Sequence, residues 1–216
     1  MKIGLISDIH GNILALEKTL EEFQKRGITQ IFCGGDIIGL GPYPEEVVQR
    51  LMAYPNVVCI QGNHEGYLTN KIPEFIHGRP IREEEINHHR WVHQMLSSSS
   101  KEYIQSFKSE AFFEIEGIKI YMTHYPSTQE GVYKDFYKFP TDQELVSLFQ
   151  DIDADVYLYG HTHVQNIKCI GGKWFVNMGA LGCPLKENDI VASVLTIENK
   201  KVSIEPLKIS YDARSC

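Results

Sequence analysis

Short apolar runs alternate with amphipathic segments along the first part of the chain. Residues 3–7, 31–33 and 57–60 are apolar runs of the length expected for buried strands. Between these runs, apolar residues recur at three- and four-residue steps after Asn12 and again from Pro44, which predicts two amphipathic helices. Strands that alternate with helices in this way predict a parallel sheet with right-handed crossover connections.

Residues 66–110 interrupt this alternation with a polar stretch of helical periodicity. Trp91 and Met95 stand four residues apart, a spacing that places them on one face of a helix. We therefore predict one domain over residues 1–216 with a helical cap inserted at about 66–110. Residues 97–100 are predicted to form a loop between two cap helices.

The remainder of the chain is dominated by predicted strands. Glu116 and Gly117 separate two apolar runs as a hairpin turn does, and Thr141 with Glu144 forms a capping box that begins a helix. Together these patterns predict an α/β fold in which two β-sheets pack against each other with helices outside. The later predicted strands cover residues 111–115, 118–123, 156–159, 164–170, 173–176, 190–197 and 202–207.

The charge of the chain limits which partners it can bind, and its cysteine content indicates the compartment in which it is found. The chain has 21 Lys and Arg residues against 28 Asp and Glu residues, which gives a net charge of −7. A protein this acidic is poorly suited to bulk binding of nucleic acid or anionic membranes. We expect no membrane span, because no apolar run reaches the length of about eighteen residues that one requires, and we expect no signal peptide. The five cysteines are odd in number and form no CxxC pair, which favours reduced thiols and a cytoplasmic protein.

Polar residues typical of metal sites follow the predicted strands. The carboxyl ends of parallel strands meet at one edge of a sheet, so residues that follow several such strands are expected to converge there. Each has an ordinary explanation when taken alone, for example a strand-end cap for Asp8 or a hydrogen-bonded loop residue for His124. Their joint occurrence is what indicates a site. The set consists of Asp8, His10, Asp36, Asn63, His64, His124, His161 and His163.

The residue types indicate the chemistry of this site. Carboxylate, amide and imidazole groups suit Mn, Fe, Zn or Ni, unlike the thiolates that soft metals prefer. In an extended segment, residues i and i+2 point the same way, so Asp8 with His10 and His161 with His163 are each expected to face one side. The set is too large for one tetrahedral ion. It is about right for two metals that share a bridging carboxylate at ~3.5–4 Å.

The motifs DIH, GGD, GNHE, a lone His after a strand, and GHTH resemble those of the calcineurin-like metallophosphoesterase superfamily. The resemblance covers residue 1 to about residue 182 and implies a two-sheet αββα sandwich. It implies that one metal is held by Asp8, His10 and His163, with Asp36 bridging, and the second by Asn63, His124 and His161. His64 would be the catalytic histidine over the substrate phosphate.

Two departures from the superfamily narrow the implied activity. Protein phosphatases and symmetrical dinucleoside tetraphosphate hydrolases carry arginines at places where this chain has Leu40 and Gln61. Without these bidentate phosphate clamps, that branch is disfavoured. Residues 35–42 look instead like those of small bacterial phosphoesterases with a broad substrate range. Tyr125 stands where many relatives have glycine, which is expected to narrow the second-metal side of the pocket.

The resemblance implies a dinuclear-metal-dependent phosphoesterase that hydrolyses phosphate mono- or diesters through a metal-bridging hydroxide. Its substrates would be small phosphorylated molecules or nucleotides. Two divalent ions are expected, Mn first, with Fe, Zn, Ni or Mg as alternatives. Hydrolysis of dinucleoside polyphosphates or phosphoproteins is a second reading. A third is a non-catalytic scaffold of the same fold, as in the retromer subunit of this superfamily, which lacks the histidine that His64 supplies here.

Two further groups of residues leave alternatives open. Glu65 either orients the His64 imidazole or is a solvated carboxylate. The basic residues of the cap either face a phosphate or lie on a solvated helix, and ordinary i,i+4 pairs such as Glu84 with His88 and Glu85 with His89 favour the solvated helix. The basic cap residues are His77, Arg79, Arg82, His88, His89, Arg90 and His93.

Overall fold

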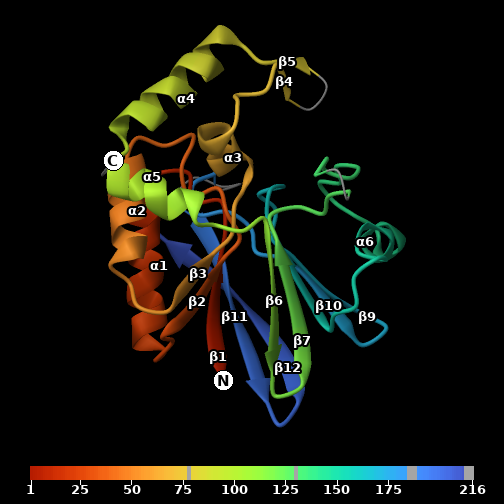
Figure 1. The fold of residues 1–216 in the computed structure, drawn as a ribbon. Helices are drawn as coiled ribbons and strands as arrows, with labels where there is room; N and C mark the ends of the chain where they lie inside the picture. Colours follow the sequence, from red (N-terminus) through yellow and green to blue (C-terminus); the bar gives the residue numbers. More distant parts are fainter. Residues whose placement is uncertain (77–78, 129–130, 184–188, 212–216) are drawn as a thin grey trace.

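The computed structural model describes residues 1–76, 79–128, 131–183 and 189–211. Its first sheet has five strands in the order β12-β11-β1-β2-β3 (Figure 1). β1, β2 and β3 are parallel, whereas β11 and β12 run antiparallel at the other side of β1. The parallel strands predicted from the apolar runs are therefore present. Their bounds are β1 (Lys2–Ile6), β2 (Gln30–Cys33), β3 (Val57–Cys59), β11 (Asp189–Glu198) and β12 (Lys201–Ser210).

The second sheet also has five strands, in the order β6-β7-β8-β10-β9. β7, β8 and β10 are parallel, and β6 and β9 pair antiparallel at the edges. β6 and β7 form the predicted hairpin and pair antiparallel along their whole length, from Ile115 with Ile118 beside the turn to Glu110 with Thr123. The bounds are β6 (Glu110–Ile115), β7 (Ile118–Thr123), β8 (Val156–Tyr159), β9 (Asn166–Ile170) and β10 (Lys173–Asn177).

The two sheets pack face to face, and helices cover their outer faces. α1 (Ile13–Lys25) and α2 (Pro44–Met52) lie against the first sheet, and α6 (Asp142–Leu148) lies beside the second (Figure 1). One buried cluster joins the inner faces, where Phe32 of β2 stacks on Phe113 of β6 at 4.3 Å between ring centroids. The sandwich that the sequence predicts is thus the observed architecture. Burial of the two inner faces is what stabilises it.

Helix starts follow the capping chemistry read from the sequence. The Asn12 side chain accepts a hydrogen bond from the Ala15 backbone N–H at 3.0 Å, and α1 begins directly after it. Thr141 and Glu144 form the predicted capping box at the start of α6. Among the described residues, no helix combines the length and the apolar character needed to cross a membrane.

The segment between β3 and β6 lies above the ends of the parallel strands (Figure 1). It is helical as predicted, but it contains three helices where two were expected, and also a two-stranded hairpin that the helical pattern did not predict. Ser97 caps α5, and residues 98–100 form its first turn, so the predicted loop at 97–100 is wrong. The elements are α3 (Asn63–Thr69), β4 (Phe75–Ile76), β5 (Arg79–Pro80), α4 (Glu83–Met95) and α5 (Ser98–Gln105).

Candidate metal centre

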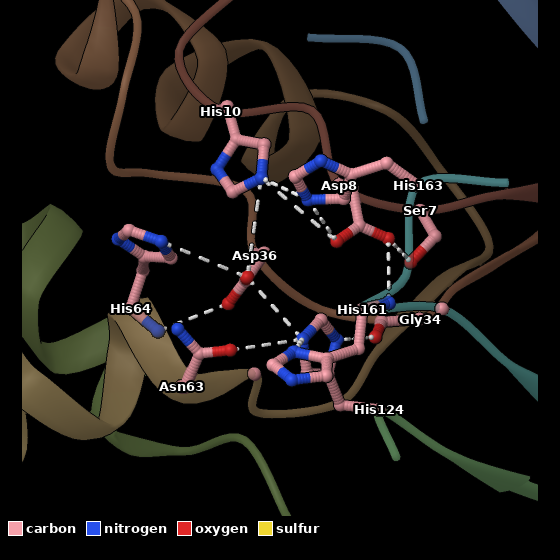
Figure 2. A network of polar contacts seen from close by, with 12 residues as sticks. Ser7, Asp8, His10, Gly34, Asp36, Asn63, His64, His124, His161 and His163 are labelled. Carbon is pink, nitrogen blue, oxygen red and sulfur yellow. Dashed lines mark hydrogen bonds and ion pairs between the residues drawn. The ribbon is translucent and has the colours of Figure 1, made fainter. Parts of the chain in front are cut away.

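All eight residues singled out by the sequence lie together at the ends of the strands (Figure 2). They follow β1, β2 and β3 of the first sheet and β7 and β8 of the second, so both sheets contribute to one site. The backbone there is unusual. Five of the eight non-glycine residues adopt the left-handed conformation, with φ between 50° and 69°, which concentrates strain at this place. They are Asp8, His10, Asp36, His161 and His163.

One group of candidate ligands consists of Asp8, His10 and His163. His163 Nε2 lies 3.2 Å from Asp8 Oδ1 and 3.0 Å from His10 Nε2. Asp8 Oδ1 is buried and has no hydrogen-bond partner. Its other oxygen, Oδ2, accepts hydrogen bonds from the Ser7 hydroxyl at 2.6 Å and from the His161 backbone N–H at 3.1 Å. The protein therefore orients one carboxylate oxygen and leaves the other facing the imidazoles.

A second group consists of Asn63, His124 and His161. His124 Nε2 lies 3.2 Å from Asn63 Oδ1 and 3.2 Å from His161 Nδ1. His124 Nδ1 donates to the Gly34 carbonyl at 2.7 Å, so its Nε2 lone pair faces the group when the ring is neutral. A hydrogen bond of this kind fixes the ring and leaves the other nitrogen free to bind a metal.

Asp36 lies between the two groups. Its Oδ1 accepts a hydrogen bond from the His64 backbone N–H at 2.9 Å. Its Oδ2 lies 3.2 Å from His124 Nε2 on one side and 4.0 Å from His10 Nε2 on the other. A carboxylate oxygen with imidazoles on both sides has the geometry of a bridging ligand (Figure 2).

The geometry corrects one detail of the sequence reasoning. His161 and His163 were expected to face one side as neighbours in an extended segment, but both have left-handed backbones. His161 instead lies against His124 in the second group, and His163 lies against Asp8 in the first. Asp8 and His10 do converge, at 3.8 Å between Oδ1 and Nε2, although through turned rather than extended backbone.

The residues present fit a pair of divalent cations. Imidazole nitrogens and carboxylate oxygens crowd within 4.8 Å of one another in overlapping sets that include His10, Asp36 and His64, and Asp36, His124 and His161. Lone pairs directed at one point repel unless a cation lies between them. The buried, unpartnered Oδ1 of Asp8 is the clearest sign that a ligand belongs there.

Comparison with known proteins identifies the family that carries this arrangement. The family model for the calcineurin-like phosphoesterase superfamily domain matches residues 1–200. The chain belongs to this superfamily. The prediction drawn from the strand-end motifs is confirmed, as is the mixed α/β fold that the superfamily implies.

Two relatives and one solved structure show how similar this chain is to known proteins. An uncharacterized protein of Methanocaldococcus jannaschii is 25% identical over 228 residues, covering 98% of this chain and 88% of its own. A phosphodiesterase of the same archaeon is 25% identical over 179 residues, covering 83% of each chain. The crystal structure of a hypothetical protein from Pyrococcus horikoshii has a TM-score of 0.83 at 17% identity, covering 99% of this chain and 90% of that one. At that identity the structural likeness shows the fold alone.

Glu65 has a role that neither sequence alternative anticipated. Its buried carboxylate accepts hydrogen bonds from the backbone N–H groups of Asp36, Ile37 and Gly62 at 2.8–2.9 Å, and of Ile38 at 3.2 Å. It is therefore neither solvated nor paired with the His64 imidazole. Burial and the nearby Asp36 carboxylate raise the pKa of Glu65 to about 7, against the opposing effect of these backbone donors. Glu65 holds the loop that carries Asp36.

Charge partners determine the protonation of the ligand histidines. Burial disfavours a charged ring at His124, but the Asp36 carboxylate outweighs it and raises the pKa of His124 to about 9. Burial likewise opposes charge at His163, where Asp8 and Cys183 raise the pKa to about 10. The Asp36 carboxyl is also buried, yet the imidazoles around it, His124 first, hold its pKa well below the usual range. A cation bound among these residues would have to displace those protons.

His64 lies against both the ligands and the cap. Its ring centroid is 4.9 Å from that of His10 and 5.0 Å from that of His89, and its Nδ1 is buried without a hydrogen-bond partner. Gly39 makes room for it, because a side chain there would place Cβ 2.5 Å from His64 Nδ1. Burial lowers the pKa of His64 to about 3, so the ring is neutral at pH 7.

Part of the cap contacts the site, so the solvated-helix reading is wrong for His88 and His89. His88 Nε2 donates to the Gly39 carbonyl at 2.6 Å, and His89 is buried against His64. Glu85 binds Arg79 through two oxygens instead of pairing with His89. His77 lies outside the described residues.

Two cavities flank the metal centre. One, of about 700 Å³, lies on the side of His124 and His161 and has aromatic walls that include Tyr133 and Phe136. The Tyr125 ring is buried 5.2 Å from that of His161, beside this cavity, as its position in the sequence suggested. The other, of about 480 Å³, lies between His64 and the cap helix α4.

Several residues of the site were missed by sequence reasoning. Ser7 and the Gly34 carbonyl orient Asp8 and His124, but hydrogen bonds of this kind leave no motif. Cys183 lies beside His10 and His163, with all three ligand atoms within 4.8 Å of one another. No motif marked Cys183, which lies six residues after the end of β10.

The Glu65 network predicts a loss of stability on a neutral substitution. In Glu65→Gln, one carboxylate oxygen becomes an NH₂ group, which cannot accept the hydrogen bonds that the backbone N–H groups donate. The free energy of unfolding should therefore fall by about 1–3 kcal/mol. Urea unfolding measures the change. Glu46→Gln, the same substitution at an exposed position of α2, is the control and should stay within about 0.5 kcal/mol of the unsubstituted protein. Equal stability of the two variants would contradict the assigned role of Glu65.

The raised pKa values of His124 and His163 predict that metal binding is linked to pH. Both rings are protonated at pH 7 in the metal-free protein, because their pKa values are about 9 and about 10. A metal must displace these protons, so affinity should rise with pH from 6 towards 9, and at pH 7 at least the two protons of these rings should be released. Calorimetric titration in buffers of different ionisation enthalpy counts them. Affinity that is independent of pH would show that these histidines are not ligands.

Proposed function

We propose that this member of the superfamily is a cytoplasmic hydrolase of phosphate mono- or diesters that works with two divalent cations. The observation that carries the proposal is Asp36, whose Oδ2 lies between two groups of imidazoles. Free cysteines at the described positions agree with a reducing compartment. The phosphodiesterase among the relatives supports the choice of ester substrates.

The ligands divide between the two cations according to the groups in the structure. Asp8, His10 and His163 would hold one cation, Asn63, His124 and His161 the other, and Asp36 would bind both. The donor set suits Mn first, with Fe, Zn, Ni or Mg as alternatives. When bound, the two cations supply a nucleophilic hydroxide from water and offset charge on the phosphate oxygens.

His64 is the proposed catalytic side chain. Its neutral imidazole carries one N–H, which can donate a hydrogen bond to the phosphate or to the oxygen of the leaving group. Protonation needs a nearby negative charge, because burial lowers the pKa of the free ring to about 3. An approaching phosphate anion supplies that charge, so substrate binding itself favours the acid form of His64.

The two cavities favour a small ester over a phosphoprotein. Gln61 and Leu40 line one cavity each, at the places where the protein phosphatase branch has arginines. The larger cavity offers aromatic surface at Tyr133 and Phe136 to a planar substituent such as a nucleobase. Small phosphate esters and nucleotides are therefore the proposed substrates, ahead of dinucleoside polyphosphates and phosphoproteins.

A scaffold without catalysis is the alternative of a different class. It would have no need for His64, nor for a buried carboxylate oxygen without a partner. A screen of the manganese-loaded protein on p-nitrophenyl phosphate, bis-p-nitrophenyl phosphate, cyclic nucleotides and dinucleoside polyphosphates separates the two. We expect turnover that chelation abolishes and manganese restores. No turnover of any ester at saturating manganese would favour the scaffold.

His64→Gln tests the catalytic assignment within that screen. Because His64 is proposed to act on substrate and not to bind metal, the variant should keep two metals per chain while kcat falls by ~10²–10⁴-fold. His93→Gln makes the same change on α4, in a ring that lines neither described cavity, and serves as the control. Metal content by mass spectrometry and steady-state kinetics provide the two readouts. Full activity in His64→Gln would remove His64 from the reaction.

A further inference from the structure

Cys183 is held beside the first group of ligands by its backbone. The preceding residues bind the end of β1, with Leu181 N–H donating to the Ser7 carbonyl at 3.2 Å and Gly182 N–H to the Asp8 carbonyl at 2.8 Å. Gly182 permits this approach, because a Cβ there would lie 2.3 Å from the Ile9 carbonyl oxygen. The position of Cys183 beside His10 and His163 therefore follows from a contact between distant segments of the chain.

The thiol faces the same space as the ligands of the first group. The ligand atoms of Cys183, His10 and His163 lie within 4.8 Å of one another. A second observation marks that space as a ligand site independently of the cysteine. Asp8 Oδ1 is fully buried, lacks a hydrogen-bond partner and lies 3.2 Å from His163 Nε2.

We propose that Cys183 binds the first metal as a thiolate, together with Asp8, His10 and His163. The inference rests on the metal centre of the proposed function and adds a ligand to it. With the bridging Asp36, the set has two carboxylates, two imidazoles and one thiolate, and the thiolate makes it suit Zn²⁺ or Fe²⁺ better than Mn²⁺ or Mg²⁺. On binding, the thiol proton is released and the sulfur–metal bond forms without any change of oxidation state.

The two metal positions then differ in chemistry. The second group, Asn63, His124 and His161, offers only oxygen and nitrogen donors and keeps the preference for Mn²⁺ expected from the sequence. The first position selects a softer ion. We therefore expect a centre with two different metals. The expectation that thiolates play no part in this site holds for the second position only.

Cobalt titration of the intact protein tests the sulfur ligand directly. A thiolate bound to Co²⁺ gives an intense charge-transfer band in the near ultraviolet, which carboxylate and imidazole ligands do not produce. In the unsubstituted protein we expect the band to reach its limit with one of the two bound equivalents. Cys183→Ser should lose the band. Cys169→Ser, which removes an exposed thiol from β9, should keep it.

Zinc affinity and thiol reactivity test the same ligand without the cobalt absorption band. Cys183→Ser should bind zinc at the first position at least ~10–100-fold more weakly, because loss of even a residue that only orients a ligand costs that much. In the unsubstituted protein, bound zinc should protect Cys183 from iodoacetamide while Cys169 remains reactive. Mass spectrometry of the peptides measures the alkylation of both cysteines in one sample. This experiment uses the unsubstituted protein, so its result does not depend on whether a variant folds.

The outcomes separate this inference from the proposed function. Two bound cobalt ions without a thiolate band, or a band unchanged in Cys183→Ser, would overturn the cysteine ligand and leave the metal centre intact. Equal alkylation of Cys183 with and without zinc would do the same. If neither cobalt nor zinc binds to the protein, the metal centre and the cysteine ligand both fail.

Discussion

The buried Asp36 carboxylate lies among the imidazoles of both ligand groups, and much of the surrounding structure serves to keep it there. Its Oδ1 is bound by the His64 backbone N–H, while its Oδ2 faces His124 and His10. The Glu65 carboxylate accepts a hydrogen bond from the backbone N–H of Asp36 itself. Burying two carboxylates so close together costs free energy unless positive charge compensates them. Protonated histidines provide that charge in the free protein, and cations would provide it in the loaded one.

The fold supplies the convergence that this carboxylate requires. Parallel strands from two packed sheets end at one edge, so segments far apart in sequence bring their polar residues together. Left-handed backbone at five ligand positions then turns the side chains inward. Strain of that kind persists only where surrounding contacts enforce it. Here these contacts are the sheet ladders, the hydrogen bond that Ser7 donates to Asp8 and the one that Glu65 accepts from the Asp36 N–H. The cap completes the site by placing His88 against the Gly39 carbonyl and His89 against the His64 ring.

Local patterns in the sequence predicted the strands of the two large sheets, the caps of α1 and α6, and all eight residues at the strand ends. They failed where a contact joins distant segments. Glu65 was misread because its donors at Asp36, Ile37 and Ile38 are remote in the chain. His89 was placed on a solvated face because helical periodicity does not reveal what packs against it. Cys183 carried no motif, since its place depends on the contact between residue 182 and the end of β1.

Anomalous diffraction from metal-soaked crystals tests the central claim most directly, with data at the manganese and zinc absorption edges. We predict two peaks ~3.5–4 Å apart, one among Asp8, His10 and His163 and the other among Asn63, His124 and His161. Both should lie within about 2.0–2.3 Å of the Asp36 carboxylate. A single peak, or two peaks with Asp36 bound to neither, would contradict the bridging role on which this account depends.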